Sequence, residues 1–325
     1  MVSRHAPIVD FHSHYLPPRQ IIGASRRAEA ERHRPLDRIA PRIGDPDAIL
    51  SDLRGAGIAT RVLSVPLPFV APGGDQDSEL IHRINDHLAD LAGRHPGRLS
   101  AHATIDAFAG DEGAREVERV ATELGFRSIF IDSARDRKLL NAESARPVLI
   151  EAARRGLTVF AHPINPPELR EQAESIGGSL GVRLARGTVN AASLLSLIQA
   201  GVFETVPGLH LVVTTLAVQA LTYISIFDDA PQFLKQARNG TRQHLYVDTM
   251  GAQPAFIRYA AELLGADHVV AGSDWPIAGR DISPDQLLPA LQAAGLTEAE
   301  QALVAGGNAA RLLGLALPDV TIAAA

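Results

Sequence analysis

The sequence predicts an α/β protein, a single (β/α)8 TIM barrel over residues 1–325. Short β-branched runs alternate with longer helical stretches, and eight strand-like runs occur along the chain. The runs are short and largely apolar, as expected for parallel strands that are buried on both faces. Eight repeats of a strand followed by a helix predict a parallel sheet closed into a barrel, and the alternative is an open doubly wound sheet.

The predicted elements follow one another in regular order. The strands are Ile8–His14, Arg61–Pro66, Leu99–Ile105, Phe126–Ser133, Leu157–Pro163, Leu209–Thr215, Leu245–Gly251 and His268–Pro276. The helices include Pro46–Gly57, Ser78–Arg94, Asp111–Leu124, Glu143–Arg155, Ala191–Val206 and Pro254–Leu264. Asp45 is suited to cap the first of these helices, with Pro46 at its first helical position. Gly125 and Gly156 end helices just before a new strand.

Two connections are longer than the barrel itself requires. They are Tyr15–Gly44 after the first strand and Ile164–Asn190 after the fifth strand. Barrel active sites form at the carboxyl ends of the strands, so we expect both segments to be long binding loops at that face. Residues 317–325 are expected to trail as a loose terminus.

The composition excludes several classes of protein. The chain is 46% hydrophobic and 21% charged, which is typical of a soluble globular protein. A net charge of −6 does not favour a nucleic-acid partner, which calls for a basic face. The absence of cysteine excludes disulfides, thiolate zinc sites and cysteine nucleophiles. No apolar run has the length of a secretory signal or a membrane span, so we expect a cytoplasmic protein without a membrane partner.

Four metal-binding residue types stand at predicted strand ends. His12 and His14 close the first strand and, being two residues apart, share one face of it. His162 closes the fifth strand, and Asp274 lies at the end of the eighth. Imidazoles with a carboxylate and no sulfur suit Zn²⁺, Mn²⁺ or Fe²⁺, with a position left for water or substrate. Each residue also has a structural alternative, such as an N-cap for Asp274 or a backbone-bonded core residue for His162.

One metal ion is expected rather than two. A binuclear site would need a bridging carboxylated lysine at the end of the fourth strand, which instead ends in Asp132 and Ser133. Lys138 lies beyond that strand, and Lys235 is the only other lysine. Zn²⁺ is the predicted ion, with Mn²⁺ and Fe²⁺ as alternatives.

Several segments resemble the amidohydrolase superfamily. They are VDFHSHYLP, VFAHP, GVFETVPGLHLVV, GSDWP and GNAARLLGL. The set is similar to the branch that contains aminocarboxymuconate-semialdehyde decarboxylase and γ-resorcylate decarboxylase. This resemblance implies a (β/α)8 barrel with one divalent metal that cleaves a C–C bond with loss of CO₂, although some relatives hydrolyse lactones or hydrate double bonds. By residue, it implies that His12, His14, His162 and Asp274 are the metal ligands.

The chain departs from the family at the sixth strand. Relatives carry a histidine followed by glycine there, whereas Thr215 occupies the place of that histidine in this chain. A threonine hydroxyl cannot serve as a general base unaided, but it can form a hydrogen bond. His210 lies five residues earlier, roughly 16 Å along the strand, so it cannot replace the missing base.

Three functions follow from these residues. The first is metal-dependent, non-oxidative decarboxylation of a small hydroxylated aromatic or unsaturated carboxylic acid, with Asp274 carrying the proton. The second is metal-dependent hydrolysis of a lactone or amide. The third is a non-catalytic or repurposed barrel, which the replacement by Thr215 favours.

Further residues are candidates for contact with a small carboxylic acid substrate. They are Tyr15 beside the two histidines, Arg42 and Arg183 in the long connections, Thr215, Trp275 beside Asp274, and Asp248 at the end of the seventh strand. Asp248 is also suited to fix the tautomer of a metal-bound imidazole. The resemblance further implies a homodimer, because relatives commonly form dimers.

Overall fold

The structure is a computed structural model that describes residues 6–26, 28, 39–71, 77–164, 166–214, 217, 219–222, 244–250, 252–277 and 282–317. With those gaps, the described chain forms two compact units. Unit 1 holds residues up to 104, residues 123–128 and residues from 248 onward. Unit 2 holds residues 105–122 and 129–247.

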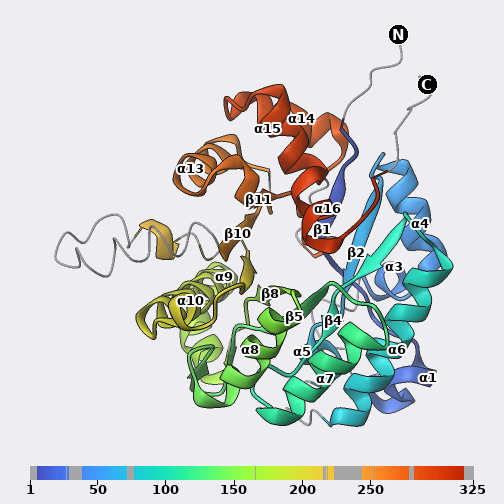
Figure 1. Cartoon of the computed structure of the whole chain (residues 1–325), viewed down its shortest axis with the longest axis vertical. Coiled ribbons are helices and arrows are strands. Elements are labelled where there is room, and N and C mark those ends of the chain that lie inside the picture. Colours follow the sequence, from blue (N-terminus) through green and yellow to red (C-terminus); the bar gives the residue numbers. More distant parts are fainter. Residues whose placement is uncertain are drawn as a thin grey trace. The chain divides into compact units, whose positions relative to one another are not determined.

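The strands of unit 1 form a parallel sheet. β1 (Val9–His14), β2 (Thr60–Ser64) and β3 (Leu99–Ala101) lie in the order β1-β2-β3 (Figure 1). The C-terminal segment that begins with β11 (Val269–Val270) runs along the other edge of β1. There, Phe11 N donates to Ala271 O at 2.9 Å, and Ser13 forms a parallel bridge with Trp275. The first and last predicted strands are therefore neighbours, and their carboxyl ends meet.

Helices and one further short strand complete unit 1. They are α1 (Arg19–Ile22), α3 (Ala40–Ile43), α4 (Pro46–Gly55), α5 (Leu67–Val70), α6 (Ser78–Arg94), β4 (Ala103–Thr104), α13 (Pro254–Leu264), η4 (Ala266–His268), α14 (Pro284–Ala293), α15 (Glu298–Ala302), η5 (Leu303–Gly307) and α16 (Asn308–Leu313). The predicted cap of α4 is confirmed, because the Asp45 side chain accepts a hydrogen bond from Asp47 N at 3.0 Å. Leu80, Ile84 and Leu88 form the buried stripe of α6 at helical spacing.

The strands of unit 2 are also parallel. β5 (Ser128–Asp132), β8 (Thr158–His162), β9 (His210–Val213) and β10 (Leu245–Asp248) are neighbours in that order. A small antiparallel ribbon joins β6 (Ala134–Arg135) to β7 (Lys138–Leu139). The helical segments are α7 (Asp111–Thr122), η2 (Glu143–Ala145), α8 (Arg146–Arg154), α9 (Pro167–Gln199) and α10 (Val202–Thr205). Parallel strands alternating with helices confirm the predicted α/β class.

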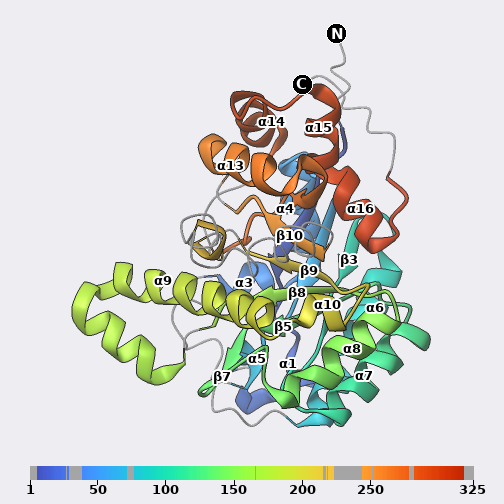
Figure 2. The ribbon, with the colours of Figure 1, turned by 60° about the vertical axis from the view of Figure 1, so that its left-hand side comes forward.

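The prediction of a loop over Ile164–Asn190 is wrong. Most of this segment belongs to α9, which begins at Pro167 and continues into the helix predicted from Ala191. Gly178 has a φ of 55° and divides α9 into two helical arms (Figure 2). A Cβ at Gly181 would overlap the carbonyl oxygen of Ala173, so the arms approach too closely for any larger residue. Gly178 and Gly181 are therefore the residues that let the two arms fold together.

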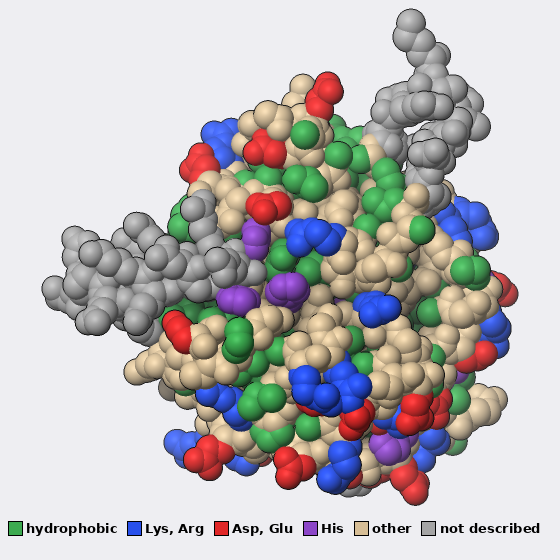
Figure 3. Space-filling view, viewed as in Figure 1, with side chains coloured by type: hydrophobic (Ala, Val, Ile, Leu, Met, Phe, Trp, Pro, Cys, Tyr) green, Lys and Arg blue, Asp and Glu red, His purple; other side chains and the backbone are tan. Residues whose placement is uncertain are grey.

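The segment Tyr15–Gly44 also contains helical structure. Its described residues include α1 and α3, and residues 29–38 lie outside the described part of the chain. Among the described helices, we find none with the length and apolar character that crossing a bilayer requires. Acidic and basic side chains are interspersed on the face drawn in Figure 3.

Candidate metal centre

His12 is held by a buried carboxylate at the carboxyl end of β1. Its Nδ1 lies 2.6 Å from Asp248 Oδ2, and both side chains are buried. A carboxylate accepts hydrogen bonds, so Nδ1 carries the ring proton and Nε2 presents its lone pair. His12 Nε2 lies 3.4 Å from Asp274 Oδ1. The prediction that Asp248 fixes an imidazole tautomer is consistent with this geometry.

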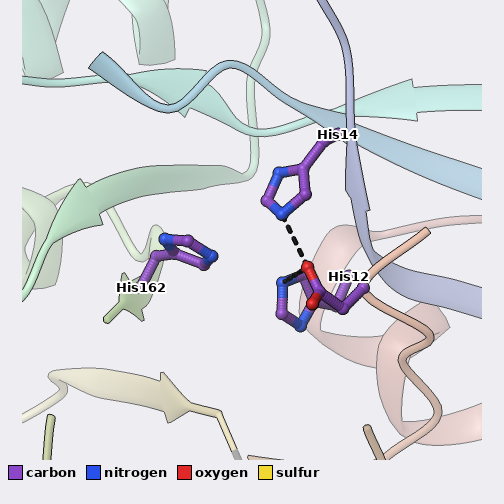
Figure 4. A group of neighbouring side chains, drawn as sticks. His12, His14 and His162 are labelled. Carbon is purple, nitrogen blue, oxygen red and sulfur yellow. Dashed lines mark hydrogen bonds and ion pairs between the residues drawn. The ribbon is translucent and has the colours of Figure 1, made fainter. Parts of the chain in front are cut away.

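His14 is held in the same tautomer by a neighbouring strand. Ser64 Oγ donates its proton to Ser13 O at 2.7 Å, so at 3.1 Å it accepts from His14 Nδ1. His14 Nε2 then faces Asp274 Oδ1 at 2.8 Å (Figure 4). The two imidazoles of β1 therefore aim the same ring nitrogen at one carboxylate oxygen.

Asp274 occupies an unusual backbone conformation. Its φ is 56°, in the left-handed region, and its N–H donates to His12 O at 2.8 Å. Trp275 O accepts from His14 N at 2.9 Å. The backbone on either side of the carboxylate is thus tied to the strand that carries the two histidines.

The electrostatics of these three side chains suit a cation. Two imidazole lone pairs and one carboxylate oxygen converge within hydrogen-bond range, so a bound positive charge is needed to relieve their repulsion. Burial lowers the pKa of His12, but the hydrogen bond to Asp248 and the charges of Asp274, Asp248 and Asp10 outweigh it, so the net shift is upward. A divalent ion can supply the charge that a proton supplies here, and the neutral imidazoles with a carboxylate are a fitting donor set.

Gly272 has no side chain, and this leaves the space in which His12 and Asp248 contact each other. A Cβ on Gly272 would lie 2.8 Å from His12 Cβ and 3.1 Å from Asp248 Cβ. The glycine of the GSDWP segment is therefore required by close packing against the histidine and its partner.

His162 is the last residue of β8 in unit 2. It is 4% exposed, and its ring packs against Phe130 with centroids 5.0 Å apart. Helix α9 holds the backbone on both sides of it. Asn190 Nδ2 donates to Ala161 O at 3.4 Å, and Arg186 Nη2 donates to Pro163 O at 3.0 Å.

The remaining predicted substrate residues are engaged elsewhere or lie at the surface. Tyr15 is buried, and its hydroxyl forms a 2.8 Å hydrogen bond with His87 Nε2. Arg42 is half-exposed and pairs with Asp52 at 2.8 Å. Arg183 lies exposed on α9. Trp275 is buried with the guanidinium of Arg61 4.2 Å above its ring. Thr215 lies outside the described residues.

A buried ion pair supporting Asp274 was not predicted. Asp10 and Arg61 are both fully buried, with Arg61 Nε 3.2 Å from Asp10 Oδ2. Asp10 also accepts hydrogen bonds from Ser273 N at 3.0 Å and Ser273 Oγ at 2.8 Å, and Ser273 directly precedes Asp274. Burial raises the pKa of Asp10, against the opposing effects of Arg61 and Ser273. Asp10 lies two residues before His12 on β1, and this spacing was the available signal.

His102 is a buried core residue. Its Nε2 lies 2.9 Å from Phe11 O and its Nδ1 lies 2.7 Å from Ser128 Oγ. Burial lowers the pKa of His102 to about 3, so the ring is neutral. Through the contact with Phe11 O, His102 supports the backbone of β1 next to the predicted ligand His12.

The chain is similar to several known proteins. The 2-amino-3-carboxymuconate-6-semialdehyde decarboxylase of Dictyostelium discoideum is 25% identical over 283 residues, covering 83% of this chain and 77% of that protein. The γ-resorcylate decarboxylase of a Polaromonas species is 26% identical over 286 residues, covering 80% and 84%. The 5-carboxyvanillate decarboxylase of Novosphingobium aromaticivorans, solved with manganese and 4-hydroxy-3-methoxy-5-nitrobenzoic acid, has a TM-score of 0.78 at 21% identity, covering 95% and 96%.

The family assignment rests on a longer match. The sequence profile of the amidohydrolase family matches residues 9–315, from the first strand to the end of the last helix. Since this match spans nearly all of the sequence, the protein belongs to the amidohydrolase family.

Proposed function

We propose that this protein is a metal-dependent, non-oxidative decarboxylase of a small hydroxylated aromatic carboxylic acid. The observation that carries the proposal is the convergence of His12 Nε2 and His14 Nε2 on Asp274 Oδ1, each imidazole held in the metal-binding tautomer. Relatives named as decarboxylases of γ-resorcylate and of an aminocarboxymuconate semialdehyde support the reaction class.

His162 is proposed as the fourth ligand. It is the last residue of β8, as His14 is the last residue of β1, and this shared position at the carboxyl end of a parallel strand supports the assignment. Three nitrogens and one oxygen suit either Zn²⁺ or Mn²⁺. The manganese in the solved 5-carboxyvanillate decarboxylase favours Mn²⁺ over the Zn²⁺ predicted from sequence.

The bound ion and the side chain of Asp274 would have separate roles in the proposed reaction. The bound ion would act as a Lewis acid for the carboxylate and an adjacent oxygen of the substrate. Among His12, His14 and Asp274, the aspartate is the most exposed, at 15%, so it can exchange a proton with water. Asp274 would give this proton to the ring carbon that carries the carboxylate. A C–H bond forms there as the C–C bond breaks, CO₂ leaves, and water restores the proton to Asp274.

We also propose that the predicted metal centre lies in a single barrel domain. The parallel strands of the two units and the fold likeness to the solved decarboxylase support one (β/α)8 barrel domain over residues 1–325. A homodimer remains our proposal for the assembly.

The test is a direct assay of products. Protein loaded with Mn²⁺ or Zn²⁺ would be incubated with hydroxybenzoic acids and, separately, with lactones, and released CO₂ would be compared with ring-opened product. We expect CO₂ from at least one hydroxylated acid, with loss of metal and of activity in His12→Ala. His95→Ala is the matched control, because His95 caps α6 away from the predicted ligands. Ring-opened product without CO₂ would favour the hydrolase instead.

A further inference from the structure

Two buried polar side chains flank His162 on the neighbouring strands of unit 2. In a parallel ladder, a backbone N–H bonds to the carbonyl of the residue that precedes its partner. Ser133 N donates to His162 O at 2.9 Å, so Asp132 is the residue beside His162 on β5. The rings of Phe130 and Phe160, two residues earlier on each strand, lie 5.4 Å apart, as this register requires.

The other neighbour of His162 is Thr214. Phe160 pairs with Val212, and Ala161 pairs with Val213. Continuing this register by one residue places Thr214 beside His162. Paired residues of adjacent strands point to the same face of a sheet. Asp132, His162 and Thr214 therefore form a row across the carboxyl ends of β5, β8 and β9.

Neither flanking group has a hydrogen-bond partner within the described part of the chain. Asp132 is 7% exposed and no hydrogen bond reaches its carboxylate, although the charge of Arg186 acts on it. Thr214 is fully buried, and its Oγ1 is unpartnered among the described residues. Buried polar groups without partners cost free energy, and natural proteins retain them where a ligand completes them.

We propose that Asp132 and Thr214 are substrate-contacting residues that bind the ring hydroxyl of a hydroxylated aromatic acid beside the ligand His162. This inference rests on the proposed function and adds to it the group that the site selects. Asp132 can accept or donate a hydrogen bond according to its protonation, and Thr214 can do both.

The experiment compares two ligands that differ only in their hydroxyl groups. Binding of γ-resorcylate (2,6-dihydroxybenzoate) and of benzoate to the manganese-loaded full chain would be measured by calorimetry for wild type, Asp132→Ala and Thr214→Val. We expect wild type to prefer γ-resorcylate, and each variant to lose about tenfold of its affinity for it while binding benzoate unchanged. Asp136→Asn is the control at an exposed position, and it should retain the wild-type preference.

The outcomes separate this inference from the proposed function. Equal weakening of both ligands in the variants would show a structural role and overturn the inference, as would unchanged binding of both. A wild-type protein without preference for γ-resorcylate would overturn it even if CO₂ is released from another acid. A wild-type protein that shows the preference, loses it in the variants and releases no CO₂ would contradict the proposed function while supporting the inference.

Discussion

Asp248 Oδ2 lies 2.6 Å from His12 Nδ1, so a fully buried carboxylate decides which nitrogen of the imidazole carries its proton. The same aspartate is anchored by Met250 N, which donates to its Oδ1 at 3.2 Å. One carboxylate oxygen of Asp248 thus accepts a hydrogen bond from its own loop, and the other accepts one from His12. This division keeps His12 Nε2 available to a metal ion.

Asp248→Asn should weaken metal binding without removing a ligand. The amide can donate to Nδ1, which would move the ring proton to Nε2 and block coordination. We expect the affinity for Mn²⁺ to fall by about 10- to 100-fold, measured by competition with a chelator. Asp136→Asn at an exposed position serves as the control. An unchanged affinity would mean that Asp248 does not control the tautomer.

Gly272→Ala should disturb the same contact by sterics alone. The added Cβ would lie 2.8 Å from His12 Cβ, so either the strand or the histidine must shift. We expect a loss of about 1–3 kcal/mol in the free energy of unfolding together with weaker Mn²⁺ binding. Denaturant unfolding and metal titration measure the two effects.

Gly93→Ala is the matched control for that substitution. Gly93 lies in α6, and a Cβ there meets no atom within 4 Å. We expect it to be neutral or to stabilise the protein by up to about 1 kcal/mol. If Gly272→Ala behaves like Gly93→Ala, the close packing of His12 against Asp248 has no energetic consequence.

Asp10→Asn should destabilise the protein more than the same substitution in an exposed ion pair. It removes the carboxylate that lies 3.2 Å from Nε of the buried guanidinium of Arg61, which keeps a second carboxylate partner, Asp52, 2.9 Å from its Nη1. Breaking a buried pair outright costs about 3–5 kcal/mol, and the remaining pair with Asp52 offsets part of this cost. Asp90→Asn removes the partner of Arg94 in an exposed i,i+4 pair and should cost under about 1 kcal/mol. Similar unfolding free energies for the two variants would refute this account.

The position of the proposed ligands His12 and His14 at the end of a strand could be predicted, because it depends on simple regularities. Alternation along a strand places His12 and His14 on one face, and strand ends are recognisable from the turn residues that follow. The Asp10–Arg61 pair could not be predicted in the same way, since the sequence does not state which distant residue compensates a buried charge. The structure also supplies the register that identifies Thr214 as a neighbour of His162.

The helical arms of α9 could not be predicted from local pattern for a different reason. Gly177, Gly178 and Gly181 lower the helix propensity of the segment after the fifth strand. In the structure, Gly178 forms the bend and Gly181 allows the close approach of the arms. Tertiary packing therefore overrides the local preference. As a result, Arg186 and Asn190, which bond to the backbone on either side of His162, lie on a helix.

Asp132→Asn should stabilise the protein, and increasingly so as the pH rises. The carboxyl has a pKa of about 7 in the folded protein because it is buried, against an ordinary value of 3.8. Between these values the unfolded chain releases a proton that the folded chain retains, so rising pH favours unfolding. The cost is about 1.4 kcal/mol per pH unit, or roughly 4 kcal/mol once the pH exceeds 7. Among the charged groups that act on this carboxyl, only Arg186 lowers its pKa.

Asparagine carries no titrating proton, so this cost disappears in the variant. The difference in unfolding free energy between Asp132→Asn and wild type should therefore grow from pH 4 to pH 7 and then level off. Urea unfolding at pH 4.5, 5.5 and 7.5, under identical metal loading, measures this difference. Asp136→Asn should show no such trend, because Asp136 is exposed. A stabilisation that is independent of pH would mean that Asp132 is already ionised in the folded protein, and that the carboxylate is compensated by neighbours rather than kept for a ligand.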